Sequence, residues 1–236
     1  MDTQKHISSA FDQDLTILND ALQKLGDLAC RQFEGAIEGI ATQNEANLDR
    51  VIKGDAALDA LEAEINEKVM EVITLRSPRA EDLRYVLVAL KVAGILERIG
   101  DYARNIANRT KVIITAGNEN IPGVNIGRMG QVTQDMVRDA LTSYRSRDAE
   151  MALAVWSRDI EVDHMHTAFY KEVLASMSRN PNMVGTGAHL LFIAKNIERI
   201  GDYATGIAEQ VHFLVKGLVP DEDRPKADKT SKVVNT

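Results

Sequence analysis

The chain has 236 residues, which is enough for one large domain or for two small ones with their own cores. Aromatic residues make up only 5% of it, with 5 Pro and 15 Gly, a composition that favours helices over a β-sandwich or barrel. The net charge of −7 argues against a general nucleic-acid-binding protein. The single cysteine, Cys30, excludes an internal disulfide and any Cys-x-x-Cys zinc or redox site, so we expect a cytoplasmic protein.

The sequence shows neither a signal peptide nor a membrane span. The first residues lack a basic segment followed by an apolar one. The most apolar run, residues 86–96, is 11 residues long and contains Lys91, whereas a membrane-spanning helix needs about 20. We therefore expect this protein to reach a membrane only through a partner.

Apolar residues recur every three or four positions through most of the chain and predict six long helices. In the first half the helices cover residues 12–41, 47–75 and 79–115, and Pro78 suits the first turn of the third. In the second half they cover residues 126–147, 149–179 and 185–217. Residues 116–124 predict a linker between a first unit (1–115) and a second unit (125–217), and the charged residues 218–236 predict a disordered tail.

The two halves repeat one another in sequence. Glu-Arg-Ile-Gly-Asp-Tyr-Ala occurs at residues 97–103 and again at 198–204, 101 residues later. In the preceding helices the matching offset is 104 residues. Seven consecutive identities far exceed chance, so we predict an all-α fold of two homologous antiparallel three-helix bundles.

The third helix of each unit is apolar on two sides. In the first unit Leu90 and Ala93 lie on one side, and Ile99 and Ile106 lie on the other. A helix that is apolar on both sides is buried on both sides. We expect these two helices to form the contact between the units or between subunits, and we predict a homodimer.

Each unit carries two acidic pairs with four-residue spacing, one on its second helix and one on its third. Both members of such a pair lie on one helix face, where like charges repel. Antiparallel second and third helices would bring the two pairs of a unit together into a four-carboxylate cluster. The eight residues are Asp55, Asp59, Glu97 and Asp101 in the first unit and Asp159, Asp163, Glu198 and Asp202 in the second.

Two interpretations of these clusters are open at this point. In one, the carboxylates pair with nearby cations in salt bridges; the candidates are Arg98, Arg104, Lys195 and Arg199. In the other, they bind a metal ion, and oxygen ligands favour Mg, Ca, Mn or Fe over zinc or copper. A di-iron enzyme would need Glu-x-x-His motifs, and the nearest approach, Asp163-x-x-His166, has no counterpart in the first unit. Gly100 and Gly201 precede the last Asp of each cluster and allow another group to approach closely.

The doubled Glu-Arg-Ile-Gly-Asp-Tyr-Ala motif, with Asp-x-x-x-Asp on each preceding helix, resembles the PhoU family over about residues 6–217. The resemblance implies two three-helix bundles, usually dimeric, whose acidic motifs bind multinuclear metal clusters in some members. Fe, Mn and Mg are the candidate ions. It also implies a cytoplasmic adaptor without catalytic activity. Its partners would be the phosphate ABC transporter ATPase and the phosphate-sensing histidine kinase, and it would keep the phosphate regulon repressed when phosphate is plentiful.

By position, the resemblance makes all eight carboxylates candidate metal ligands. Asn105 fits the family pattern as a weaker candidate, but its equivalent in the second unit is Gly206. Glu209 is a further weak candidate there and stands where the first unit has Asn108. The alternative function is a metal-dependent helical enzyme or a metal store that uses the same carboxylates. The sequence shows no convincing proton-transfer group beside them, which favours the adaptor.

Overall fold

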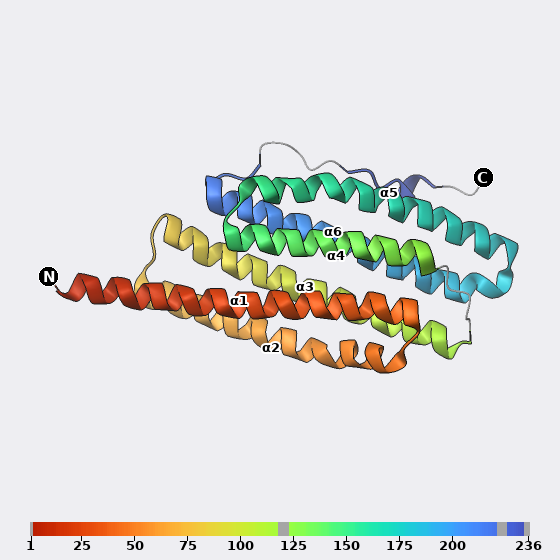
Figure 1. Cartoon of the computed structure of the whole chain (residues 1–236), viewed down its shortest axis with the longest axis horizontal. Coiled ribbons are helices and arrows are strands. Elements are labelled where there is room, and N and C mark those ends of the chain that lie inside the picture. The colour runs from red at the N-terminus through yellow and green to blue at the C-terminus, as the bar shows by residue number, and fades with distance from the viewer. Residues whose placement is uncertain (1, 118–122, 221–225, 234–236) are drawn as a thin grey trace.

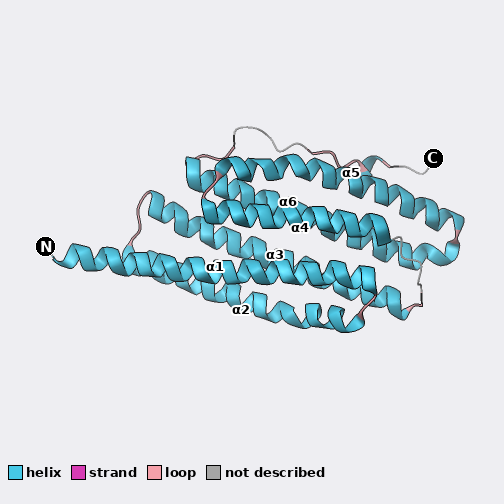
Figure 2. Cartoon of the chain, viewed as in Figure 1, coloured by secondary structure: helices cyan, strands magenta, loops and turns pink. Residues whose placement is uncertain are grey.

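The computed structural model describes residues 2–117, 123–220 and 226–233, and side chains from residue 10 onward except at 123 and 124. The described residues form six long α-helices and no strand (Figure 2). The helices are α1 (Asp2–Thr42), α2 (Glu45–Arg76), α3 (Glu81–Thr115), α4 (Gly123–Ser146), α5 (Ala149–Arg179) and α6 (Val184–Lys216). Two short 3-10 helices, η1 (Pro181–Met183) and η2 (Thr230–Lys232), complete the assignment. The all-α prediction is confirmed.

Short capped loops set the helix boundaries and turn consecutive helices back on one another. The Asn44 side chain accepts a hydrogen bond from the Asn47 N–H at the start of α2, and Asp148 caps α5 in the same way. The position of Pro78 differs from the sequence-based prediction, which put it in the first turn of the third helix. It lies in the loop before α3, because the chain takes a left-handed turn at Ser77 and has a positive φ again at Ala80 before the helix begins.

The six helices form two three-helix units side by side (Figure 1). Helices α1, α2 and α3 pack against one another in the first unit, and α4, α5 and α6 do so in the second. The units meet along α3 and α6, with a smaller contact between α1 and α4. No helix among the described residues is both long enough and apolar enough to cross a membrane.

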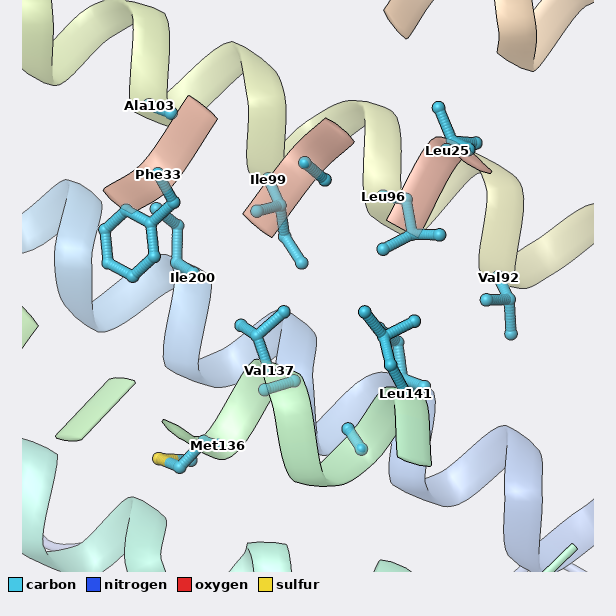
Figure 3. Packing of buried hydrophobic residues seen from close by; sticks show 14 of the residues in the cluster. Leu25, Phe33, Val92, Leu96, Ile99, Ala103, Met136, Val137, Leu141 and Ile200 are labelled. Atoms are coloured by element: carbon cyan, nitrogen blue, oxygen red, sulfur yellow. The ribbon is translucent and has the colours of Figure 1, made fainter. Parts of the chain in front are cut away.

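One continuous hydrophobic core runs through both units. Figure 3 shows Phe33 of α1, Ile99 of α3, Val137 of α4 and Ile200 of α6 meeting in its centre. The second apolar side of α3 is therefore covered by the other unit of the same chain, as one of the two sequence-based alternatives expects. These apolar faces consequently give no reason for a dimer, and the homodimer stays a prediction.

The prediction of a disordered tail differs from the structure at residues 226–233. The backbone N–H of Ala227 donates to Asp163 Oδ2 at 2.6 Å, and the N–H of Lys229 donates to Thr167 Oγ1 at 3.2 Å. Helix η2 then packs on α5. Polar backbone contacts hold this segment, and such contacts leave no apolar periodicity in the sequence.

Candidate functional site: two carboxylate clusters

The first cluster lies where α2 and α3 approach each other closely. Asp55 on α2 is 5% exposed, and Asp101 on α3 lies across from it. Gly100 makes this approach possible, because a Cβ at that position would clash with the buried side chain of Leu58. The close neighbour of Gly100 is thus a core leucine of α2.

One guanidinium joins the acids of the two helices. Arg104 donates through Nη1 to Asp55 Oδ2 and through Nη2 to Asp101 Oδ1, the latter at 2.6 Å. Arg98 adds a weaker contact, with Nη1 at 3.4 Å from Asp101 Oδ2. The positive charge of Arg104 therefore lies between the carboxylates of α2 and α3.

The four carboxylates of the first unit lie close enough to affect one another's protonation. Burial raises the pKa of the Asp55 carboxyl, and Asp59 and Asp101 raise it further against the opposing charge of Arg104. Burial also raises the pKa of Glu97, with additional contributions from Asp101 and Asp59. Arg104 and Arg98 join Asp55, Glu97 and Asp101 by ion pairs, whereas Asp59 is exposed on α2 and makes no such pair with them. The four carboxylates outnumber these two cations.

The second cluster lies between α5 and α6 and is more deeply buried. Asp159 and Asp163 on α5 are 2% and 5% exposed, and Glu198 on α6 is 6% exposed. A Cβ at Gly201 would lie 3.5 Å from Asp159 Oδ1 and 3.6 Å from Val162 Cγ1, so this glycine faces both a carboxylate and the core at ordinary contact distances. Asp202 lies at the outer edge, where its Oδ2 is 3.4 Å from Arg199 Nη1.

Lys195 offsets part of the charge of this second cluster, and the C-terminal segment packs on it and adds a further carboxylate, Asp228. Lys195 Nζ lies 2.7 Å from Glu198 Oε2 and 3.5 Å from Asp228 Oδ2. Asp228 also lies 3.6 Å from Nδ1 of His166, a buried residue whose pKa is lowered by burial and raised in part by Asp228. Together with the Ala227 N–H on Asp163, these contacts place the tail over the α5 side of the cluster.

Sequence reasoning missed Asp228, and no sequence signal was available to find it. It lies 65 residues beyond Asp163, outside both repeats, in a segment without periodicity. Its neighbour His166 is visible as part of Asp163-x-x-His166 but lacks a counterpart in the first unit. Of the weaker candidates, Asn105 is exposed on α3, and Glu209 lines a surface hollow beside Asp202.

The donor chemistry of both clusters suits hard cations, because carboxylate oxygens are the ligands that Mg, Mn and Fe accept. The geometry does not fit a bound ion as it stands. Within the described ranges, no three carboxylate, imidazole or thiol groups are arranged to hold a metal ion. In the first unit Arg104 holds the oxygens of Asp55 and Asp101 that would bind the ion. Arginine and lysine side chains offset part of the negative charge in this arrangement, and metal binding remains a prediction.

The fold and its paired acidic motifs define a helical-bundle protein made of two homologous repeats. The chain belongs to the PhoU family. The family model described as PhoU domain matches it twice, at residues 22–110 and 126–211, one match in each unit. This double match confirms the internal repeat and the resemblance found in the motifs.

Known proteins are similar over nearly the whole chain. The phosphate-specific transport system accessory protein PhoU homolog of Caulobacter vibrioides is 38% identical over 97% of this chain and 99% of its own length. The protein of the same name from Rhizobium meliloti is 35% identical over 96% of this chain and 95% of its own length. The crystal structure of PhoU from Pseudomonas aeruginosa superposes with a TM-score of 0.86 at 29% identity, covering 88% of this chain and 100% of that one.

Proposed function

We propose that this protein is an accessory protein of a phosphate-specific transport system and that it represses the phosphate regulon when phosphate is plentiful. The observation that carries this proposal is the end-to-end similarity to accessory proteins of that name, at 38% identity over 97% of the chain. Such a match spans both repeats and the positions of both acidic clusters. The proposal therefore rests on the whole architecture and not on one shared domain.

The proposed partners are the phosphate ABC transporter ATPase and the phosphate-sensing histidine kinase. The protein would act in the cytoplasm as an adaptor without catalytic activity of its own, as a homodimer, and would reach the membrane only through these partners. Its net charge of −7 supports docking onto basic patches, because complementary charge speeds encounter and excludes wrong partners.

A deletion strain tests the regulatory role directly. We expect alkaline phosphatase to stay high in phosphate-rich medium when the gene is deleted and to return to low levels when the wild-type gene is restored. Normal repression in the deletion strain would reject the proposal. Affinity purification of the tagged protein with tagged transporter ATPase and kinase tests the two partners separately.

We further propose that the clusters bind Mg, Mn or Fe ions under some conditions. The supporting observation is that each cluster has more carboxylates than cations, several of them partly or fully buried. Burial first and neighbouring carboxylates second raise the pKa of Asp55, Glu97 and Glu198. The eight carboxylates would be the ligands, with Asn105 and Glu209 as weaker contributors. Arg104 would have to move away in the first unit and the tail in the second.

Elemental analysis of protein purified without added metal, before and after dialysis against Mn or Fe, tests this second proposal. We expect bound metal in the wild type and its loss in an Asp101→Ala, Asp202→Ala double variant. Absence of bound metal from the wild type would reject it and leave the regulatory proposal standing. If the double variant restores repression in the deletion strain, metal is dispensable for regulation. Metal-dependent turnover would instead favour the alternative of an enzyme or metal store.

A further inference from the structure

The last segment that the structure describes, residues 226–233, is held against the second unit through its backbone. The N–H of Ala227 donates to Asp163 Oδ2 at 2.6 Å, and the N–H of Lys229 donates to Thr167 Oγ1 at 3.2 Å. Helix η2 then packs on α5 (Figure 1). Both of these N–H groups thus donate to side chains of α5. We name residues 226–233 the tail segment.

The side chain between the two N–H groups is the carboxylate of Asp228. Its Oδ1 accepts the N–H of Thr230 at 2.9 Å, which closes an Asx turn within the tail segment. Its Oδ2 faces the second unit, where it lies 3.5 Å from Lys195 Nζ and 3.6 Å from His166 Nδ1. The second unit therefore receives a turn that presents one carboxylate between two backbone N–H groups.

Four side chains of the second unit receive this turn, and we name them the tail site: Asp163, His166, Thr167 and Lys195. Only Asp163 has an acid at the equivalent position of the first unit, Asp59. The offsets of 104 and 101 residues pair the other three with Glu62, Ala63 and Gly94. There the turn would set its carboxylate against Glu62, and Ala63 has no side-chain oxygen to accept an N–H. The tail site is thus specific to the second unit and complements the turn group by group.

The tail segment leaves one buried group of the tail site unsatisfied. His166 is 2% exposed, and its Nδ1 makes no hydrogen bond within the part of the chain that the structure describes. The Asp228 carboxylate lies 3.6 Å away, which is beyond hydrogen-bond distance. A buried polar atom without a partner is unfavourable. A ligand whose carboxylate comes closer to His166 would therefore gain a hydrogen bond that the tail segment does not make.

The tail segment is also held weakly enough to exchange with another ligand. Hydrogen bonds to its backbone replace bonds to water, so each contributes little to closure. The side chains of Lys195 and Asp228 are 38% and 22% exposed, and solvent screens an ion pair of that exposure. Ordering the eight residues of the segment costs conformational entropy at each of them. The closed and open states therefore differ little in free energy, and the tail site is accessible in the open one.

We propose that the tail site is a docking surface for an Asp-centred turn of a partner protein, and that the tail segment occupies it as a built-in competitor. The partner would place its Asp carboxylate on Lys195 and His166 and its flanking N–H groups on Asp163 and Thr167. Because the tail segment belongs to the same chain, its effective concentration is high, and it excludes partners that bind less well. The inference concerns the second unit alone and needs neither the regulatory role nor a bound metal.

The tail site combines an acceptor with a donor, and this combination selects a peptide over other ligands. Asp163 accepts from an N–H, whereas Lys195 donates to a carboxylate. An anion without donor groups would leave Asp163 unsatisfied. A metal ion would be repelled by the Lys195 ammonium. A peptide with a carboxylate and an N–H on adjacent residues satisfies both side chains.

Peptide binding to the full-length protein, without added metal, tests the proposal. The probe is a fluorescein-labelled peptide with the sequence of residues 226–233, and the matched probe has Asn in place of its Asp. Asp228→Lys in the protein sets two cations against each other and opens the tail site. By fluorescence anisotropy, we expect the Asp probe to bind this open variant at least ten-fold tighter than the wild type. We expect the Asn probe to bind the open variant at least ten-fold more weakly than the Asp probe does.

Second substitutions in the open variant test which side chains receive the probe. Lys195→Ala should weaken the Asp probe about ten-fold. Lys111→Ala, which removes an ion-paired lysine of similar exposure in the first unit (31% against 38%), should have no effect. Thr167→Val removes one hydroxyl acceptor and should weaken the probe several-fold, whereas Thr74→Val on α2 should not. Circular dichroism and urea unfolding verify that each variant is folded.

A third probe, with an Asp-Gly-Thr turn between Ala and Gly residues, separates a partner site from a site for the tail segment alone. We expect it to bind the open variant within ten-fold of the first probe, because the tail site contacts the Asp and the backbone. The proposal is overturned if neither Asp probe binds the open variant, if only the tail-derived one binds, or if the Asn probe binds equally well. It is also overturned if the wild type binds as tightly as the open variant, or if Lys195→Ala and Lys111→Ala behave alike.

Light scattering tests whether the tail segment reaches a second copy of the chain. We expect Asp228→Lys to leave the solution mass unchanged. A mass that falls from dimer to monomer would overturn the proposal, because the tail segment would then bridge two copies. None of these outcomes changes the expected phenotype of the deletion strain.

Discussion

The two carboxylate clusters share the same acidic motif and differ in what neutralises it. In the first unit the cation is Arg104, which follows the motif on α3 and joins Asp55 to Asp101. The second unit has Thr205 at the equivalent position, and its cation is Lys195, which precedes the motif where the first unit has Gly94. A tail segment with no counterpart in the first unit completes the second cluster.

This difference shows that both repeats contain the same acidic residues, whereas the cations that pair with them come from different positions. A buried carboxylate needs compensation, but a cation can reach it from more than one place on the neighbouring helices. The two clusters therefore hold similar charge with different chemistry around it. Variants at equivalent positions of the two units should then behave unequally, and the following predictions measure by how much.

The largest difference is expected at the glycine within the motif. Gly100→Ala should lower the free energy of unfolding by about 1–3 kcal/mol, because its Cβ would enter the space of the buried Leu58 side chain. The matched variant Gly201→Ala meets only ordinary contacts and gains helix propensity of up to about 1 kcal/mol. Urea unfolding of both variants measures the two effects. Equal destabilisation would show that the two helix pairs approach each other equally closely.

The loss of Arg104 comes next. Arg104→Gln should lower the free energy of unfolding by about 1–2 kcal/mol, because it leaves the buried Asp55 without its cation. The side chain of Arg104 is 35% exposed, so solvent screening keeps the effect below that of a fully buried pair. Adding Asp55→Asn should recover part of the loss, which a double-mutant cycle measures. Full additivity would mean that the two residues do not interact.

The clusters should also respond differently to pH. The pKa of Glu97 is raised by burial and by Asp101, so its contribution to stability is largest at low pH and is lost as the pH rises through the folded-state pKa. His166 acts in the opposite direction, because burial lowers its pKa and its contribution is lost as the pH falls below its ordinary value. As the pH falls from about 7 to 5, protonation of Glu97 should raise the free energy of unfolding and protonation of His166 should lower it. On acidification, Glu97→Gln should therefore make this free energy rise less steeply, and His166→Gln should make it rise more steeply. Urea midpoints across this range measure both, and an unchanged slope in either variant contradicts its assignment.

The smallest effect is expected at the tail. Ala227→Pro removes the N–H that donates to Asp163 and should lower the free energy of unfolding by about 0.5–1.5 kcal/mol. The freed segment should also be cut faster by trypsin after Lys229. Lys216→Ala, near the end of α6, serves as a control for the loss of a surface trypsin site. An Ala227→Pro variant that is cut no faster than the wild type would show that the tail is held by other contacts.

The helices are predictable because apolar residues recur at helical spacing, and the repeat is predictable because the same seven residues occur twice. Apolar spacing predicts all six helices, and the two apolar sides of α3 predict that it is buried on both sides, by the other unit or by another subunit. The starts were less accurate. Helix α1 begins at Asp2 and not near residue 12, because its first turns are polar, and α3 begins at Glu81 and not at 79.

The candidate site was predictable only where it depends on helix geometry. Four-residue spacing and antiparallel helices suffice to bring Asp55 to Asp101, and they also place Arg104 and Lys195 within reach as counter-charges. Asp228 was beyond such reasoning, since its place depends on backbone hydrogen bonds made by a segment without pattern. Whether a metal joins either cluster depends on competition with these cations, which spacing alone does not determine.

The shared core has a consequence for how the protein is made. The apolar side of α3 that faces the second unit is covered by α6, whose motif leaves the ribosome 101 residues later. At about 5–20 residues per second, that separation in sequence becomes a delay of about 5–20 s. During that interval the first unit has formed its helices and still presents the face that α6 will cover. Nascent chains of this protein are thus candidates for chaperone capture at the midpoint of synthesis, and slower translation of the second half should increase their aggregation.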